Sequence, residues 1–105
     1  EQYLKLRAET FEGEDDVYVI EEGISPEQGR KLADLIADKI SGTVTVFVKN
    51  GSGYRYSIIS RSKDISGMVK DINQALNGRG GGRGGFAQGS VSVRRKDIEE
   101  FFKNK

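Results

Sequence analysis

Thirteen consecutive residues, GRGGGRGGFAQGS at positions 78–90, combine the side chains and the backbone that could bind an anion. Seven of them are glycine, half of the 14 glycines in the chain. Glycine lets a ligand approach the main chain closely, and consecutive exposed N–H groups can form a concave nest for phosphate oxygens. Arg79 and Arg83 would add bidentate, charge-assisted hydrogen bonds. The stretch therefore predicts a structured anion-binding loop over residues 78–89, with these two arginines as the leading phosphate ligands.

Two other interpretations of this stretch stay open. A run of glycines is typical of a flexible linker, although periodic segments flank it closely and leave no second domain to link. The string RGGGRGGF is also typical of a disordered Arg-Gly-Gly tract that binds RNA nonspecifically, although only two such units are present. The common phosphate-loop patterns do not fit, because Gly82 is followed by Arg83 instead of Lys and Ser or Thr, and because no strand immediately precedes the stretch.

The distribution of charge also indicates an anionic partner. The formal net charge is only +1, but residues 1–40 carry eleven acidic and five basic side chains, whereas residues 41–105 carry five and twelve. No acidic residue lies between Ile72 and Lys96. Such asymmetry is typical of a domain with one anion-facing side. Three further basic residues are expected to extend this positive surface: Arg94, Arg95 and Lys96.

The residue types that are missing narrow the chemistry. The chain has no cysteine and no histidine, which excludes disulfides, thiolate zinc sites and imidazole bases from this segment. We therefore expect no catalytic residue, no metal site and no cofactor in this domain. No apolar run approaches the roughly 20 residues that cross a bilayer, so we expect no contact with a membrane. The expected location is the cytoplasm. The acidic residues of one cluster have no recognisable ligand spacing and are interpreted as a solvated turn: Asp15, Asp16, Glu21 and Glu22.

Hydrophobic periodicity predicts a single α+β domain in which helices pack on one central mixed sheet, in the order β-α-β-β-α-β-α. The first helix has the clearest signature, because Ser25 is an N-cap followed by Pro26 and, three residues on, by Gln28. The turn Asn50-Gly51-Ser52-Gly53 predicts a hairpin. The expected strands are 17–20, 43–48, 54–60 and 90–93, and the expected helices are 25–41, 65–77 and 96–103.

Three aromatic residues are candidates for stacking on RNA bases. Tyr54 and Tyr56 alternate on one face of a predicted strand, an arrangement that stacks bases in some RNA-binding sheets. Because the surrounding consensus is missing, we interpret both as core residues. Phe86 is interpreted either as a stacking platform for a base or as a hydrophobic plug that anchors the loop.

A longer motif resembles a known family. The run Asn77-Gly78-Arg79-Gly80-Gly81-Gly82-Arg83, followed by Phe86-Ala87-Gln88-Gly89, resembles the G-x-GGGR…(M/F)-A-Q-G signature of the DHH-associated C-terminal domain. This domain occurs in alanyl-tRNA synthetases and alanyl-tRNA editing proteins. It also follows the catalytic part of Asp-His-His phosphoesterases, where histidine usually takes the place of Arg83. The chain departs from the synthetases at Gly84-Gly85, where they often have Pro-Asp, and at Gly89-Ser90, where they continue through several glycines.

The resemblance implies a noncatalytic module, residues 17–104, that grips tRNA, with alanine tRNA as the expected partner. Gly80, Gly81 and Gly82 would let the ligand approach the backbone, and Gln88 would form a specific hydrogen bond. The parent protein is expected to be an alanine–tRNA ligase or an editing aminoacyl-tRNA hydrolase, with zinc and ATP as cofactors outside this domain.

Two further expectations concern the alternative function and the amino end. The alternative is the substrate-binding domain of an Asp-His-His phosphoesterase acting on nucleotides or single-stranded nucleic acid. Residues 1–16 are interpreted as the end of an upstream linker or helix. A homodimer through that helix is expected, because its apolar residues could continue a coiled coil.

Overall fold

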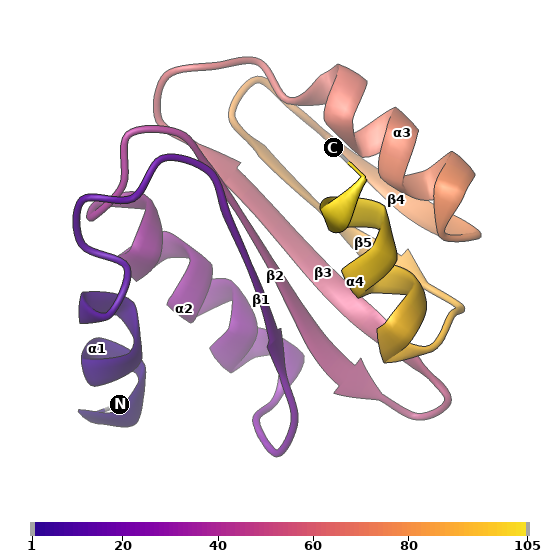
Figure 1. Cartoon of the computed structure of the whole chain (residues 1–105), viewed down its shortest axis with the longest axis horizontal. Helices are drawn as coiled ribbons and strands as arrows, with labels where there is room; N and C mark the ends of the chain where they lie inside the picture. The colour runs from indigo at the N-terminus through magenta and orange to yellow at the C-terminus, as the bar shows by residue number, and fades with distance from the viewer. Residues whose placement is uncertain (1, 105) are drawn as a thin grey trace.

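Five strands form one sheet in the computed structural model, which describes residues 2–104 (Figure 1). Their order across the sheet is β1-β2-β3-β5-β4, and β1 is parallel to β2 while every other neighbouring pair is antiparallel. The mixed sheet of an α+β domain is thereby confirmed. The strands are β1 Val17–Glu21, β2 Thr43–Asn50, β3 Gly53–Ser60, β4 Gly78–Arg83 and β5 Phe86–Val91.

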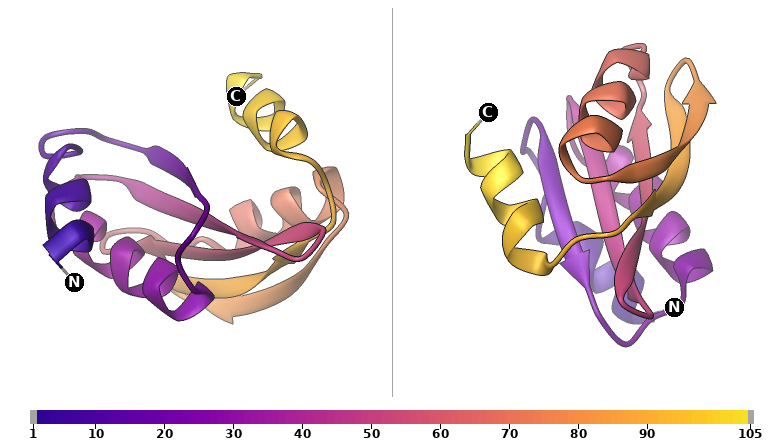
Figure 2. Two further views of the ribbon diagram at one scale, coloured as in Figure 1. Left: turned by 90° about the horizontal axis from the view of Figure 1, so that it is seen from below. Right: turned by 90° about the vertical axis from the view of Figure 1, so that its right-hand side faces the viewer.

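Four helices cover the two faces of this sheet unequally. Helix α2 (Pro26–Ala37) packs over β2 and β3 with α1 (Gln2–Glu9) beside it. Helices α3 (Ser66–Ala75) and α4 (Arg95–Lys103) lie on the opposite face (Figure 2). None of these helices is long and apolar enough to cross a membrane.

Local sequence signals place the start of α2 and the first hairpin as predicted. The Ser25 hydroxyl accepts a hydrogen bond from the Gln28 N–H at 3.1 Å, and the Gln28 side chain accepts one from the Ser25 N–H at 2.8 Å. This reciprocal pair satisfies two amides that a helix start leaves without partners. In the first hairpin Asn50 pairs with Gly53, and Gly51 adopts a φ of 63° that glycine tolerates at no steric cost.

The hydrophobic core consists of two clusters, one on each face of the sheet. Strand β2 contributes to both, because Val44, Val46 and Val48 pack toward α2 while Phe47 packs toward α3 and α4. The strand β2 is therefore central and covered on both sides. Tyr54 and Tyr56 are 3% and 2% exposed and belong to the α3 side, so their interpretation as core residues is confirmed.

Helix α1 is tied to the rest of the domain by both packing and charge. Leu4 and Ala8 are buried in the α2-side cluster. The carboxylate of Glu21, at the end of β1, accepts hydrogen bonds from the Tyr3 hydroxyl at 2.7 Å and from Arg7 Nε at 2.8 Å. A carboxylate as buried as Glu21 needs such partners.

The structure corrects the prediction for residues 78–93. The glycine-rich stretch is not a loop but two paired strands, β4 and β5, and the strand expected at 90–93 ends at Val91. Glycine has a low intrinsic preference for strands, so the local pattern gave no strand signal. Pairing of β5 with β3, from Tyr54 opposite Val91 to Ile59 opposite Phe86, overrides that preference.

The burial of Tyr56 predicts a loss of stability in alkali. Burial raises the pKa of the Tyr56 hydroxyl above its ordinary value of 10.0. Above that value the unfolded chain loses this proton before the folded chain does, so the free energy of unfolding falls as pH rises through the folded-state pKa. We expect urea unfolding between about pH 8 and about pH 11 to show this decline, and Tyr56→Phe to make it shallower. Parallel declines in the two proteins would contradict the assignment to Tyr56.

Candidate nucleic-acid interface

The hairpin of β4 and β5 turns at Gly84-Gly85 and is anchored at its tip. Gly84 has a φ of 59°, as the first central residue of a two-residue type II′ turn requires. The Gly84 carbonyl accepts a hydrogen bond from the Ile65 N–H at 2.8 Å, and the Gly85 carbonyl accepts one from the Ser60 N–H at 2.8 Å. The tip is therefore held against the segment that joins β3 to α3, and the flexible-linker interpretation does not apply.

On the face of this hairpin toward α3, the glycine positions have no room for a side chain. A Cβ on Gly82 would lie 2.0 Å from the Phe86 carbonyl oxygen and 2.5 Å from the Ala87 Cα. Below Gly80 and Gly89 lies the Tyr56 hydroxyl, which donates to Asn73 Oδ1 at 2.9 Å. Asn73 Nδ2 in turn donates to the Gly80 carbonyl at 3.2 Å. The glycines of this face are thus explained by close packing within the protein.

The opposite face of the hairpin carries the predicted ligands. Strand residues alternate between faces, so Arg79, Gly81 and Arg83 point away from α3. Their partners across the ladder are Ser90, Gln88 and Phe86, respectively. Because α2 covers only β2 and β3, this half of the sheet is open, and the two arginines, Phe86 and Gln88 are exposed. The fold therefore brings together five of the predicted site residues.

The charges on this open face have one sign. Arg79 and Arg83 form no ion pair or hydrogen bond with another side chain of residues 2–104. Arg55, exposed on β3 opposite Ser90, adds a third positive charge to the same face. None of the residues that β3, β4 and β5 place on this face is acidic. Removing water from a charged guanidinium costs free energy, and an anion that takes the place of the water offsets that cost. Arginines without an internal partner are therefore suited to bind an external anion.

The concave nest of amides that we predicted is not present. In an antiparallel ladder every second residue of an edge strand directs its N–H toward its partner strand. β4 is such an edge, so β5 engages half of its amides and the other half face the open border of the sheet. Backbone contacts with a ligand are therefore restricted to that border and to the bare strand at Gly81.

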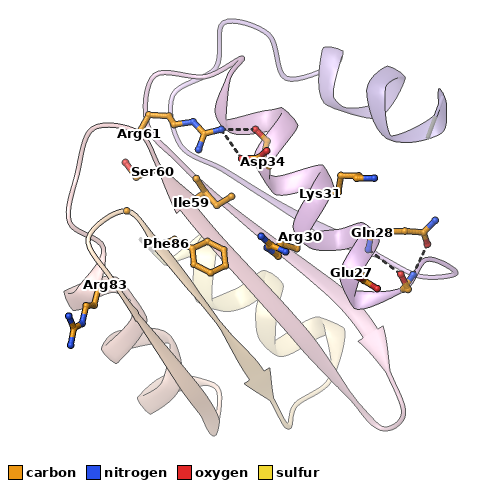
Figure 3. A pocket seen from close by; sticks show the side chains of 12 residues that line it. Glu27, Gln28, Arg30, Lys31, Asp34, Ile59, Ser60, Arg61, Arg83 and Phe86 are labelled. Carbon is orange, nitrogen blue, oxygen red and sulfur yellow. Dashed lines mark hydrogen bonds and ion pairs between the residues drawn. The ribbon is translucent and has the colours of Figure 1, made fainter.

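Sequence reasoning missed a residue from α2 that completes this surface. The Arg30 guanidinium carbon lies 5.8 Å from the centre of the Phe86 ring (Figure 3). No local signal could have found this contact, because 56 positions separate the two residues and only the packing of α2 on the sheet joins them. Arg61 also borders the groove between α2 and the hairpin, but Asp34 and Asp38 hold its guanidinium at 2.9 Å and 3.0 Å.

The remaining predicted basic residues lie on the other side of the sheet. Arg94 and Arg95 begin α4, which packs on the α3 side (Figure 2). Arg95 Nε lies 3.1 Å from a Glu99 carboxylate oxygen and Arg94 Nε lies 3.8 Å from one of Asp97. The structure thus does not join them to Arg79 and Arg83 in one continuous patch.

The acidic cluster near the amino end is used for local structure. Asp16 accepts a hydrogen bond from the Thr43 N–H at 2.8 Å, Asp15 pairs with the Ser41 hydroxyl, and Glu21 holds α1. Among residues 2–104 no group of three or more carboxylates is arranged to hold a metal ion.

Comparison with known proteins decides the family. A family profile described as the DHHA1 domain matches residues 15–104. The chain belongs to the DHHA1 domain family. The resemblance stated from the glycine motif is thereby confirmed.

Relatives and a solved structure place this DHHA1 domain beside the alanine–tRNA ligases. It is 36% identical over 81 residues to the alanine–tRNA ligase of Bdellovibrio bacteriovorus, a match that covers 71% of the chain and 9% of that protein. It is 28% identical over 104 residues to that of Acholeplasma laidlawii, covering 95% of the chain and 12% of that protein. The crystal structure of the C-Ala domain from Aquifex aeolicus alanyl-tRNA synthetase superposes with a TM-score of 0.69 at 22% identity, covering 85% of this chain and 89% of that one.

These comparisons bear on the two functions expected from the sequence. The chain spans about a tenth of the length of the ligases that it matches, at 9% and 12%. The structural likeness confirms the fold. Both relatives are ligases, so the phosphoesterase alternative is not favoured.

The two faces of the hairpin predict opposite effects of adding a methyl group. A Cβ on Gly81 would meet nothing within 4 Å, whereas one on Gly82 would overlap backbone atoms. We expect Gly82→Ala to lower the free energy of unfolding by about 1–3 kcal/mol through overpacking. Gly81→Ala should leave it unchanged or raise it by up to about 1 kcal/mol, because the unfolded chain loses entropy. Urea unfolding of the two variants measures these free energies. Equal losses of stability would show that both faces of the hairpin are closely packed.

Proposed function

We propose that this DHHA1 domain is a noncatalytic tRNA-binding module of an alanine–tRNA ligase or of an alanyl-tRNA editing protein. One observation carries the proposal: Arg79 and Arg83 lie without carboxylate partners on the part of the sheet face that no helix covers. Family membership and the names of the relatives support tRNA as the anion.

The spacing of the arginines fits a polyanion better than a single phosphate. At about 3.3 Å per strand residue, the Cα atoms of Arg79 and Arg83 are about 13 Å apart. The two guanidiniums therefore contact separate phosphates of one backbone, and Gly81 between them lets the sugar–phosphate chain lie close to the strand. Phosphate contacts supply affinity and orientation but carry no sequence information. Preference for alanine tRNA would then depend on RNA shape and on the Gln88 amide.

The chemistry of the parent protein belongs to other segments. The chain has neither the histidine nor the cysteine that would hold the zinc of an editing site. Zinc and ATP are therefore proposed only for the parent protein, in the cytoplasm where tRNA is charged. The homodimer stays a prediction, and Tyr3 and Leu6 on α1, which are 51% and 54% exposed, would carry it.

Removing the two unpaired arginines is the direct test of the proposal. We expect Arg79→Ala/Arg83→Ala to weaken binding of alanine tRNA and to flatten its salt dependence. By counterion release, each lost phosphate contact lowers the slope of log affinity against log salt by about 0.7–0.9. Filter binding or calorimetry over a range of salt concentrations measures this slope. Stability should change by less than about 0.5 kcal/mol, because both side chains are exposed.

A matched variant removes the same charge from the other face of the sheet. Arg94→Ala/Arg95→Ala should change the slope much less, because these residues lie on the α4 side and pair with Asp97 and Glu99. Equal slopes for the two double variants would show that net charge alone matters. An unchanged slope for Arg79→Ala/Arg83→Ala would remove these residues from the interface.

Gly81→Val tests whether the ligand approaches the backbone. Valine suits an exposed strand position, and no atom of the protein blocks it. We expect the variant to melt at or above the temperature of the original domain while it binds tRNA more weakly. Affinity and melting temperature falling together would instead make Gly81 a structural residue.

A further inference from the structure

Phe86 is a large apolar side chain that is exposed, and the packing of the fold does not require this exposure. Among residues 2–104 four large apolar side chains are exposed: Tyr3, Leu6, Tyr18 and Phe86. Only Phe86 lies on the open sheet face, with 36% of its surface accessible. On the same face Ile59 pairs with it across the ladder and is buried. One edge of the ring is therefore anchored while part of it stays available to a ligand.

The groups around the Phe86 ring suit a ligand that is both planar and anionic. A groove runs between α2 and the tip of the hairpin, and Phe86 lies on its floor (Figure 3). Arg30 reaches from α2 toward the ring, at 5.8 Å from its centre. Arg83 lies at the margin with its side chain directed away from the ring. Two acidic residues, Glu27 and Asp34, line the groove. Asp34 is already paired with Arg61.

This combination matches a nucleotide base better than a phosphate alone. Aromatic rings and guanidinium planes are the two side-chain surfaces on which RNA bases stack. Gln88 lies two residues from Phe86 on the same face of β5, about 6.6 Å away along the strand. Its amide offers both donors and an acceptor, and its cross-strand neighbour Gly81 has no side chain to cover it. A base on Phe86 could therefore present its edge to Gln88.

We infer that Phe86, Arg30 and Gln88 bind one unpaired nucleobase, so that this surface prefers single-stranded or looped RNA to regular duplex. The inference rests on the proposed function, because it names the part of the RNA that the same face receives. A base within a duplex has both ring faces covered by its neighbours and its edge engaged in pairing. Only a base that has left the stack offers a ring face to Phe86 and an edge to Gln88.

Tryptophan at position 86 provides the test, because the chain contains no tryptophan. In Phe86→Trp the only indole reports on stacking at the site. The probes are an unstructured RNA 12-mer, the duplex that it forms with its complement, and inorganic polyphosphate. We expect the single strand to quench the indole fluorescence strongly, and the duplex and polyphosphate to quench it little even at concentrations that saturate binding.

Tyr18→Trp is the matched control. Tyr18 is 37% exposed, nearly the same as Phe86, but it lies on the other side of the sheet, stacked on Phe102 at 4.4 Å. Its fluorescence should not respond to the single strand. Equal quenching in both variants would mean that the signal does not come from a base at position 86, and would overturn the inference.

Affinity of a truncated variant gives a second, independent measurement. Loss of one stacked base costs about 1–3 kcal/mol, which is about 5- to 150-fold in affinity. We expect Phe86→Ala to lose this much affinity for the single strand and almost no affinity for the duplex. Phe86→Tyr should keep its affinity for both. Thermal melts verify that each variant is folded.

The outcomes separate the two proposals. If the unsubstituted domain binds RNA with the expected salt dependence but Phe86→Trp shows no quenching and Phe86→Ala no loss, the base site is wrong and the proposed function stands. Equal losses for single strand and duplex also overturn the base site. If the unsubstituted domain binds neither these RNAs nor alanine tRNA, the proposed function itself fails.

Discussion

The close packing of the β4–β5 hairpin over Tyr56 is the constraint on which the open sheet face and the proposed interface depend. Tyr56 places its hydroxyl beneath Gly80 and Gly89, where a Cβ would approach it to 2.8 Å and 2.7 Å, and Asn73 joins it to the hairpin. Side chains cannot occupy the β4 positions on that face, so the side chains of β4 lie on the other one. Period-2 alternation then presents the two arginines of this strand together.

The unequal cover of the sheet turns this arrangement into a surface. Helix α2 lies over β2 and β3 and stops short of the hairpin, while α3 and α4 fill the opposite face. A third helix over β5 and β4 would have buried Phe86 and Gln88. The asymmetry of charge along the chain follows the same division, because the acidic first part forms α1, β1 and α2 and the basic part forms the open half of the sheet.

The partners of the arginines distinguish their roles. Arg7 and Arg61 hold elements together through carboxylates, and Arg94 and Arg95 pair within α4. Arg79 and Arg83 have no such partner in the described part of the chain. A guanidinium that is already neutralised gains little from an external phosphate, whereas one without a carboxylate retains its full attraction for a polyanion.

The sequence by itself determined the elements whose signals are local. The capping residues of α2, the turn between β2 and β3, and the alternation of Tyr54 and Tyr56 each act over a few positions, so they could be read without the fold. The glycine motif was equally local, and it identified the family and five residues of the open face. Only the tertiary structure decided that this motif is a hairpin and which of its faces is open, because strand pairing with β3 outweighs the weak preference of glycine. It also decided that Arg30 meets Phe86 while Arg94 and Arg95 lie behind the sheet, since those placements depend on how distant segments pack.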